Sequence, residues 1–418
     1  MYADAYLALN STHKFIKIAI MMTKQIKNVK VFGAGFVGFA NGLVYSKKYK
    51  VEFIERDLEK ITLINKKICP IEDQHASEIS ASNWENITAT NAFPTDFKDC
   101  HLVIIAVPTN YDASLNHFDV KTLEETLHCI RRYDCNVPVL IKSTIPIAFT
   151  EQFLKDNDYV EVFFSPEFLQ EGSAIIDAEN PARIILSPKN ASAEVLLTEL
   201  RDLTESEASV CLLMDTTEAE SVKLFANGYL AMRVAFFNEL DNFCLSRNLD
   251  TKSIIEGVCL DKRIGMYYNN PGFGFGGYCF PKDTQQLRQQ VSASGSTIIK
   301  NIHASNELRM EAIAEHILKN FGNKIGIYKL AMKSGTINAR SSSMLKVIEH
   351  LAIKGCTIYV FDPDNADFHF EFDNVTIVCS LPELDEKSDV ILVNRITDQL
   401  QHQQFSKPIF TRDVFNCG

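Results

Sequence analysis

A glycine-rich turn near the start of the chain limits the possible folds more than any other feature of the sequence. Residues 33–38 read GAGFVG and directly follow 29–32, a short run of β-forming residues. Between a strand and a helix, such a GxGxxG sequence lets the main chain approach a pyrophosphate, which the helix N-terminus binds. Glu55 ends the next predicted strand. A carboxylate there accepts hydrogen bonds from ribose hydroxyls and repels a 2′-phosphate, so the turn predicts a Rossmann domain that binds NAD rather than NADP.

Predicted strands and helices alternate through the first half of the chain. The apolar run 101–109 contains a proline near its end, which is typical of a strand buried on both faces of a parallel sheet. Amphipathic periodicity predicts a helix over 120–132. Further strands are predicted over 51–56, 137–144 and 160–167, and a further helix over 58–67. This βαβ alternation predicts an α/β fold with a doubly wound parallel sheet.

A long helix is predicted where this alternation stops. Residues 216–248 contain no proline and one glycine, and they are apolar on more than one face. We expect a buried helix there that connects two domains or forms the core of a dimer. Shorter helices are predicted over 251–260 and 284–291, with a glycine-rich loop between them.

The alternation returns in the last part of the chain. Strands over 324–331, 357–364, 389–394 and 407–415, with a helix over 342–355, indicate a second and smaller Rossmann-like domain. Ligands commonly bind between domains, so we expect the active site in a cleft between these parts. The predicted division is a disordered extension over 1–27, an NAD-binding Rossmann domain over 28–213, a central helical dimerisation domain over 214–318 and a C-terminal Rossmann-like domain over 319–418.

The charge and the cysteine content exclude several classes of protein. The net charge is 42 − 53 = −11, which argues against broad binding to nucleic acid or to an anionic membrane. No apolar run approaches the roughly 20 residues that a membrane-spanning helix needs. The 11 cysteines form no CxxC pair, so we predict no metal site and a reducing compartment, the cytoplasm.

A second glycine-rich segment indicates chemistry. Residues 272–283 hold four glycines within six positions, followed by Cys279, Lys282 and Asp283. The glycines let the main chain wrap closely around a ligand. A thiol next to a lysine and a carboxylate can act as an activated nucleophile. A buried cysteine that serves as a small hydrophobic residue is the alternative interpretation.

Three other groups of polar residues lie at positions where a site would need them. Lys223 and Asn227 are one turn apart on the predicted long helix. Glu167 and Glu171 follow one buried strand, and residues 142–146, KSTIP, end another. Parallel sheets bind ligands at the carboxyl ends of their strands. On spacing alone, a solvated helix face, an ordinary loop and a proline turn remain open interpretations of these three groups.

These motifs together are similar to those of the UDP-glucose/GDP-mannose dehydrogenase family, and most of all to its bacterial members that act on UDP-glucose. The resemblance is collinear from about residue 28 to the final TRDVF, and its segments are GAGFVG, PTNYD, KSTIP, SPEFLQEG, TTEAESVKLFAN, PGFGFGGYCFPKD and MKSGTINARSSS. It implies the oxidation of UDP-glucose at C6 to UDP-glucuronate in two successive steps, which consume two NAD and one water. The long helix predicted over 216–248 makes a homodimer the expected assembly.

The resemblance implies a role for each catalytic position. Cys279 would add to the C6 aldehyde to give a thiohemiacetal and then a thioester. Lys223 and Asn227 would stabilise the C6 oxyanion. Asp283 would activate water or relay a proton. Thr144 and Glu167 would hold that water, and Glu167 would be the base for thioester hydrolysis.

The resemblance also implies the residues that contact the two ligands. For NAD these are Gly33, Gly35, Phe36, Val37, Gly38, Glu55, Lys60, Thr109, Thr144, Glu171, Lys282 and Arg340. For UDP-glucose, whose UDP part the C-terminal domain would bind, they are Glu167, Phe168, Leu169, Lys223, Asn227, Arg263, Tyr268, Asn270, Phe273, Gly274, Gly276 and Lys333. In some members Arg263 reaches the sugar site from the other subunit. Arg395 is a further candidate for the phosphates.

Alternative functions remain to be weighed against this one. A sister enzyme would act on GDP-mannose or a UDP-N-acetylhexosamine, but SPEFLQEG followed by NPARII fits the glucose branch better. A non-catalytic protein that senses NAD and nucleotides would lack a catalytic residue, whereas Cys279, Lys223 and Asp283 are all present. A plain hydroxyacid dehydrogenase would need neither the thiol nor the third domain. Glu55 is a departure, because aspartate is commoner there in the family.

Overall fold

The computed structural model describes residues 28–97, 100–133, 136–157, 161–206, 208–330, 342–365, 367–396, 400 and 403–416. The chain forms two compact units, Met1–Lys223 and Leu224–Gly418. The boundary falls inside one helix, α9 (Thr216–Arg247), which is continuous through it. The predicted extension 1–27 and two predicted ligand contacts, Lys333 and Arg340, lie outside the described residues.

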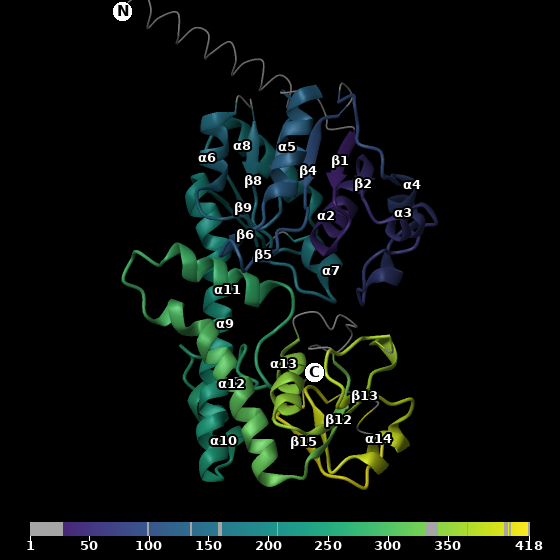
Figure 1. The fold of residues 1–418 in the computed structure, drawn as a ribbon. Helices are drawn as coiled ribbons and strands as arrows, with labels where there is room; N and C mark the ends of the chain where they lie inside the picture. The colour runs from purple at the N-terminus through teal and green to yellow at the C-terminus, as the bar shows by residue number, and fades with distance from the viewer. Residues whose placement is uncertain are drawn as a thin grey trace, which may run out of the picture. The chain divides into compact units, whose positions relative to one another are not determined.

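The main sheet of the first unit is parallel throughout, as predicted. Its strand order is β3-β2-β1-β4-β7-β8, which is the order of a doubly wound Rossmann sheet. The strands lie side by side with helices around them (Figure 1). Their bounds are β1 (Asn28–Phe32), β2 (Lys50–Ile54), β3 (Ile87–Thr90), β4 (Leu102–Ile105), β7 (Val139–Ile141) and β8 (Val162–Phe164).

Both faces of this sheet are buried, which explains the continuous apolar runs in its sequence. Val31 and Ile104 belong to one hydrophobic cluster, whereas their neighbours Phe32 and Ile105 belong to another on the opposite face. The helices of the unit are α2 (Phe36–Ser46), α3 (Leu58–Asn65), α4 (Ala81–Glu85), α5 (Lys121–Tyr133), α6 (Phe149–Asp156), α7 (Ala174–Glu179) and α8 (Ala191–Leu203), with the 3-10 turn η1 (Ala76–Glu78).

Two small sheets complete the first unit. None of their strands was predicted from the sequence. One is the parallel pair β9 (Arg183–Leu186) and β10 (Val210–Leu213), and the other is the antiparallel pair β5 (Tyr111–Asp112) and β6 (His117–Phe118).

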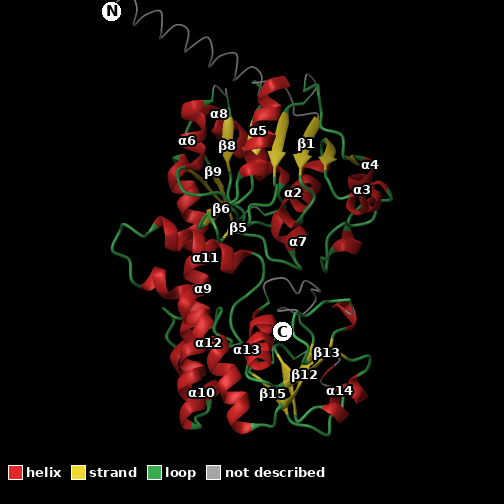
Figure 2. Cartoon of the chain, in the orientation of Figure 1, coloured by secondary structure: helices red, strands yellow, loops and turns green. Residues whose placement is uncertain are grey.

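The second unit contains another parallel sheet, which confirms the predicted C-terminal α/β region. Its strand order is β13-β12-β11-β14-β15. Figure 2 shows its strands in yellow and the long helices α9, α10 and α12 running alongside one another. The strands are β11 (Lys324–Tyr328), β12 (Thr357–Phe361), β13 (Val375–Ile377), β14 (Val390–Val393) and β15 (Ile409–Thr411). The helices that follow α9 are α10 (Thr251–Cys259), α11 (Cys279–Gln290), α12 (Ile298–Asn320), α13 (Ser343–Ile353) and α14 (Leu381–Lys387), with η2 (Pro363–Asn365).

Helices α11, α12 and α14 of this unit differ from the sequence prediction, which included neither α14 nor the strand β13. Helix α12 was not predicted, although it is among the longest of the described helices. Helix α11 begins at Cys279 and not at residue 284, so the thiol belongs to the first turn of a helix rather than to a loop. Pro281 misled the prediction, because a proline in the first turn costs no hydrogen bond and is tolerated there.

The long helix α9 is partly buried within this single chain. Phe225, Tyr229, Phe236 and Phe243 are 45%, 57%, 58% and 50% exposed and recur at spacings of four and seven residues. The predicted homodimer would cover such a stripe, and it stays a prediction.

Three further properties concern the described residues alone. None of their helices combines the length and apolar character of a membrane span. They contain no group of three or more His, Cys, Asp or Glu side chains arranged to hold a metal ion. The nine cysteines among them form no disulfide.

Candidate functional site

The glycine turn after β1 is shaped by its own main chain. Gly33 has a φ of +91°, and a Cβ there would lie 2.6 Å from the carbonyl oxygen of Ala106. A Cβ on Gly38 would lie 2.0 Å from the carbonyl oxygen of Gly33. At Gly35, by contrast, no protein atom lies within 4 Å of a Cβ. The turn therefore leaves open space at the N-cap of α2, where a pyrophosphate would approach the main chain.

Glu55 lies at the carboxyl end of β2 and contacts the same turn. One carboxylate oxygen accepts a hydrogen bond from the Ala34 N–H at 2.6 Å. The other accepts from the N–H groups of Arg56 at 2.7 Å and Asp57 at 3.1 Å. A carboxylate is thus fixed beside the dinucleotide-binding turn, where the sequence predicted a ribose partner. The turn and this carboxylate together fit an NAD site.

Predicted site residues also meet at the ends of β4, β7 and β8 in the first unit. Thr109 donates a hydrogen bond to the carbonyl oxygen of Thr144 at 2.6 Å. The Nζ of Lys223 donates to the carbonyl oxygen of Glu167. These four residues come from loops after three neighbouring strands and from the first part of α9. Adjacent parallel strands deliver their following loops to one edge of the sheet, which is why the residues converge.

The sequence analysis singled out the segment KSTIP but assigned no role to its first residue, Lys142, which belongs to this cluster. It is 6% exposed, forms an ion pair with the carboxylate of Glu167, and donates to Ser165 Oγ at 3.0 Å. A buried charge needs such a partner. The lysine at the start of KSTIP, directly after a buried strand, was the signal that could have identified it.

The residues after Glu167 are held by aromatic and main-chain contacts. The Arg183 guanidinium lies 3.7 Å from the centre of the Phe168 ring, and Lys223 Nζ lies 5.4 Å from it. Leu169 packs against the hydrophobic cluster of the sheet. Glu171 precedes Gly172, whose carbonyl oxygen accepts from the Gln74 N–H at 2.9 Å. Lys60 lies apart from these residues, near the start of α3.

In the second unit, Cys279 stands out among the cysteines. Of the nine described cysteines, Cys279 and Cys379 are exposed, and the others are buried or partly buried. Burial raises the pKa of Cys69 to about 11 and that of Cys100 to about 12, so both remain unreactive thiols. Cys279 is the first residue of α11, and the N-terminus of a helix stabilises a thiolate.

Lys282, Asp283 and Asn227 form a buried group next to this thiol. Lys282 Nζ lies 2.9 Å from one carboxylate oxygen of Asp283, and Asn227 Nδ2 donates to the other at 2.6 Å. Burial alone would lower the pKa of Lys282, but the charges of Asp283, Tyr278 and Cys279 outweigh it and raise that pKa. Lys282 is therefore an ammonium that interacts with the thiol.

The glycine loop before Cys279 lies at the carboxyl ends of β14 and β15. Asn270 Nδ2 donates to Asp413 at 2.6 Å, and Arg395 Nη1 donates to the Pro271 carbonyl oxygen at 2.6 Å. The Phe273 ring is fully buried and stacks on Phe410 with 5.8 Å between ring centres. The predicted cradle thus occupies the ligand-binding edge of the second sheet, with the Phe273 side chain turned into the core.

The remaining predicted substrate contacts are more exposed or more strained. The Arg263 side chain is 89% exposed and pairs with its neighbour Asp261. Tyr268 is 41% exposed and has a φ of +49°. Gly274 has a φ of +139°, which a side chain rarely adopts, and Gly276 follows it in the loop.

Sequence models of one family match almost the whole described chain. The NAD binding domain of the UDP-glucose/GDP-mannose dehydrogenase family matches residues 27–203, its central domain matches 217–308, and its UDP binding domain matches 326–417. The second match explains the helical middle region, and the third explains the second parallel sheet.

Individual proteins resemble the chain over nearly its full length. The UDP-glucose 6-dehydrogenase of Campylobacter jejuni is 36% identical over 93% of this chain and 98% of the relative. That of Streptococcus pneumoniae is 35% identical over 93% of this chain and 99% of the relative. A UDP-glucose dehydrogenase structure from Pyrobaculum islandicum shares the fold, with a TM-score of 0.82, 24% identity, and coverage of 94% of this chain and 96% of the other. The chain belongs to the UDP-glucose/GDP-mannose dehydrogenase family, as the motifs predicted.

Proposed function

We propose that this chain oxidises the C6 alcohol of UDP-glucose to the carboxylate of UDP-glucuronate, using two NAD and one water. The observation that carries the proposal is the exposed Cys279 thiol in the first turn of α11, beside the Lys282 ammonium. An enzyme that stops at the aldehyde needs no nucleophile. A thiol that traps the aldehyde makes the second oxidation possible. The names of the relatives support UDP-glucose as the substrate.

The reaction balances in three stages. In the first, C6 loses a hydride and its hydroxyl loses a proton, which gives the aldehyde. In the second, the Cys279 thiolate adds to the aldehyde carbon, the oxygen takes a proton, and the thiohemiacetal then loses a hydride and a proton to become a thioester. In the third, water adds to the thioester carbon and the carbon–sulfur bond breaks, which releases the carboxylate and one proton and restores the thiol. NAD, when bound, accepts one hydride in each oxidation.

The chain's own side chains have separate tasks in this proposal. Lys223 and Asn227 stabilise negative charge on the C6 oxygen. Asp283 orients Asn227 through their hydrogen bond and accepts or relays a proton. Glu167, with Thr144, holds and activates the hydrolytic water, and Lys142 forms an ion pair with the Glu167 carboxylate.

We assign the two ligands to the two parallel sheets. The turn at Gly33, Gly35 and Gly38 with Glu55 binds the dinucleotide, and Thr109, Glu171, Lys60 and Lys282 are proposed as its other contacts. The glycine loop, with Asn270 and Tyr268 before it, binds the nucleotide sugar. Lys333 and Arg340 stay sequence predictions for the phosphates and the cofactor. We also propose the four-part domain division, a homodimer in which Arg263 contacts the sugar site, and a cytoplasmic location.

The test is an NADH absorbance assay with UDP-glucose and NAD on three proteins: the wild type, Cys279→Ser and Cys379→Ser. Cys379 is the matched control because it is the other exposed cysteine of the described chain. We expect two NADH per UDP-glucose from the wild type and from Cys379→Ser. We expect turnover at least about 10³-fold lower in Cys279→Ser. Acid-quenched wild type should carry the sugar as a thioester adduct in mass spectrometry.

Other outcomes would redirect the assignment. One NADH per sugar, or full activity in Cys279→Ser, would contradict the covalent mechanism. No NADH from UDP-glucose together with NADH from GDP-mannose or UDP-N-acetylmannosamine would identify a sister enzyme. No NADH with any nucleotide sugar would favour a non-catalytic binding protein.

A further inference from the structure

The segment 270–275, at the start of the glycine loop, is buried although it has no regular secondary structure. Residues 271–275 are all buried, and 270 is partly buried. Buried main-chain N–H and C=O groups need hydrogen-bond partners, and a loop cannot supply them from a helix or a sheet ladder. Here side chains supply them.

Side chains of α12 and α9 bond to one side of this segment. The Gly272 carbonyl oxygen accepts from Arg309 Nε at 3.0 Å and from Nη2 at 2.7 Å. The Gly272 N–H donates to Asn238 Oδ1 at 3.0 Å. Asn306 accepts from the Phe275 N–H at 2.7 Å and donates to the Phe275 carbonyl oxygen at 2.8 Å. Arg309 and Asn306 are three residues apart on α12 and so lie on one face of that helix.

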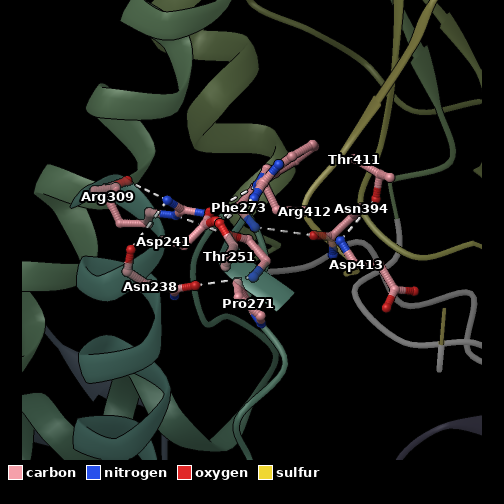
Figure 3. A network of polar contacts seen from close by, with 12 residues as sticks. Asn238, Asp241, Thr251, Pro271, Phe273, Arg309, Asn394, Thr411, Arg412 and Asp413 are labelled. Carbon is pink, nitrogen blue, oxygen red and sulfur yellow. Dashed lines mark hydrogen bonds and ion pairs between the residues drawn. The ribbon is translucent and has the colours of Figure 1, made fainter. Parts of the chain in front are cut away.

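The other side of the segment is bonded from the ends of β14 and β15. The Phe273 N–H donates to Asn394 Oδ1 at 3.4 Å, beside the contacts of Arg395 and Asp413 described above. Figure 3 shows Arg309 and Asn238 on one side of Pro271 and Phe273, and Asn394 on the other. Hydrogen bonds therefore hold the segment at residues 270–273 and at 275.

Arg309 itself is fixed by a buried carboxylate. It is 1% exposed, and its Nη2 lies 2.6 Å from Asp241, which also accepts from Arg412 Nε at 2.9 Å and from Thr251 at 2.8 Å. Burial alone would raise the pKa of Asp241. The hydrogen bond from Arg412 and the charge of Arg309 lower that pKa by more than burial raises it, so the carboxylate stays ionised. The planar fork of arginine lets one side chain bond both this carboxylate and the Gly272 carbonyl oxygen.

We propose that Arg309 and Asn306 are positioning residues for the nucleotide-sugar site, because they fix the shape of the glycine loop through its main chain. The proposal rests on the proposed function of that loop as the sugar-nucleotide cradle. A glycine with open space around it separates the held segment from the thiol: Gly277 has a φ of +79° and no protein atom within 4 Å of a Cβ. The two residues therefore control substrate binding more than the chemistry of Cys279.

The first test compares Arg309→Lys, Arg309→Met and Asn306→Ala with a matched control, Asn374→Ala. Asn374 Nδ2 donates to the carbonyl oxygens of Ala352 at 2.9 Å and Cys356 at 2.7 Å, so it holds a different turn of the same unit. In Asn306→Ala we expect KM for UDP-glucose to rise about tenfold, with kcat changed by less than about threefold and KM for NAD unchanged. Arg309→Met should exceed that rise, and Arg309→Lys should restore part of it. Asn374→Ala should lower Tm without changing either KM.

The second test does not depend on activity. Hydrogen exchange of the amides of Gly272, Phe273 and Phe275 should become faster in Asn306→Ala and Arg309→Lys, and it should stay unchanged in Asn374→Ala. Unchanged exchange would overturn the proposal, and so would faster exchange with unchanged KM. If the wild type does not oxidise UDP-glucose but exchange responds as expected, the hold on the loop is supported and the substrate assignment fails.

Discussion

The two glycine-rich segments of this chain reach similar positions by different means. Residues 33–38 and 272–277 each follow or meet the carboxyl ends of parallel strands, and each leads into a helix, α2 or α11. The first segment is fixed by main chain against main chain, since Gly33 and Gly38 have no room for a Cβ beside carbonyl oxygens. The second is fixed by side chains that reach it from α9, α12, β14 and β15.

The two segments differ in how much of their conformation is determined by nearby residues. The first segment is constrained by the main-chain carbonyl groups of Gly33 and Ala106 and by the nearby Glu55 carboxylate, so few side chains determine its shape. The second depends on Asp241, Arg309 and Arg412, and the two pairs that Asp241 forms span 68 and 171 residues of sequence. Substitutions inside the first segment should therefore disturb its main chain directly, whereas substitutions around the second segment should act through the side chains that hold it.

The largest effect is expected for Gly38→Ala. The added Cβ would lie 2.0 Å from the Gly33 carbonyl oxygen, and a main-chain atom cannot yield as a side chain can. We expect the first unit to lose about 3 kcal/mol of stability and measurable NAD binding. Calorimetry and titration with NAD would measure the two losses.

Gly257→Ala is the control for this substitution. Gly257 lies within α10, and no protein atom lies within 4 Å of a Cβ there. Alanine is the better helix former, so this variant should gain about 0.5–1 kcal/mol. A Gly38→Ala protein with wild-type Tm would show that the turn can adjust, and the contrast between the two segments would disappear.

A smaller effect is expected for Gly274→Ala in the second segment. Its φ of +139° is unfavourable for alanine, but the nearest atoms are side-chain atoms of Met310 at 3.0 Å, Asn306 at 3.1 Å and Ser343 at 3.2 Å. Methionine adapts readily, so we expect a loss of about 1–2 kcal/mol and a raised KM for UDP-glucose. Urea denaturation together with steady-state kinetics would measure both. A loss as large as that of Gly38→Ala would mean that the second segment is as rigid as the first.

Features determined by nearby residues could be predicted from the sequence, and features determined by distant residues could not. The turn at 33–38, Glu55, Cys279 and both parallel sheets follow from short patterns of glycine, β-forming and charged residues. Helix α12 was missed, and with it Arg309 and Asn306, although its buried residues Ile302, Asn306, Arg309, Ile313 and Ile317 recur at the three- and four-residue spacing of a helix. The partners of Arg309 come from distant parts of the chain, so no local pattern indicates them.

Two buried carboxylates on α9, Glu220 and Asp241, should make stability depend on pH in opposite directions. Burial raises the pKa of Glu220 to about 7; one of its oxygens accepts from the Thr150 N–H at 3.0 Å, and Oε2 has no hydrogen-bond partner. Its contribution to stability is fully present below its unfolded pKa near 4.5 and is lost as pH rises through 7. Asp241 has a lowered pKa, so its contribution is present above 3.8 and is lost only as pH falls below that value.

We therefore expect the first unit to become more stable as pH falls from 8 to 5, by on the order of 2 kcal/mol for Glu220, while the contribution of Asp241 stays constant. Hydrogen exchange resolved by peptide would report each unit separately. Glu199, whose pKa burial also raises to about 7, titrates in the same range, so the difference between wild type and Glu220→Gln isolates Glu220. An identical pH profile in Glu220→Gln would contradict the prediction.

The smallest effect on stability, and the sharpest test of the comparison, is expected for Gly35→Ala. This glycine lies between Gly33 and Gly38 in the sequence, yet its φ of −78° suits alanine and no protein atom lies within 4 Å of the added Cβ. The fold therefore places no demand on it, and Tm should stay within about 2 °C of wild type because surface-like substitutions cost under about 0.5 kcal/mol. A pyrophosphate that approaches the main chain would meet the methyl group, so Kd for NAD should rise at least about tenfold. Unchanged NAD affinity would mean that the open space at the N-cap of α2 is not the pyrophosphate site. A stable protein with weakened NAD binding would show that Gly35 is needed for the ligand, whereas Gly33 and Gly38 are needed for the turn itself.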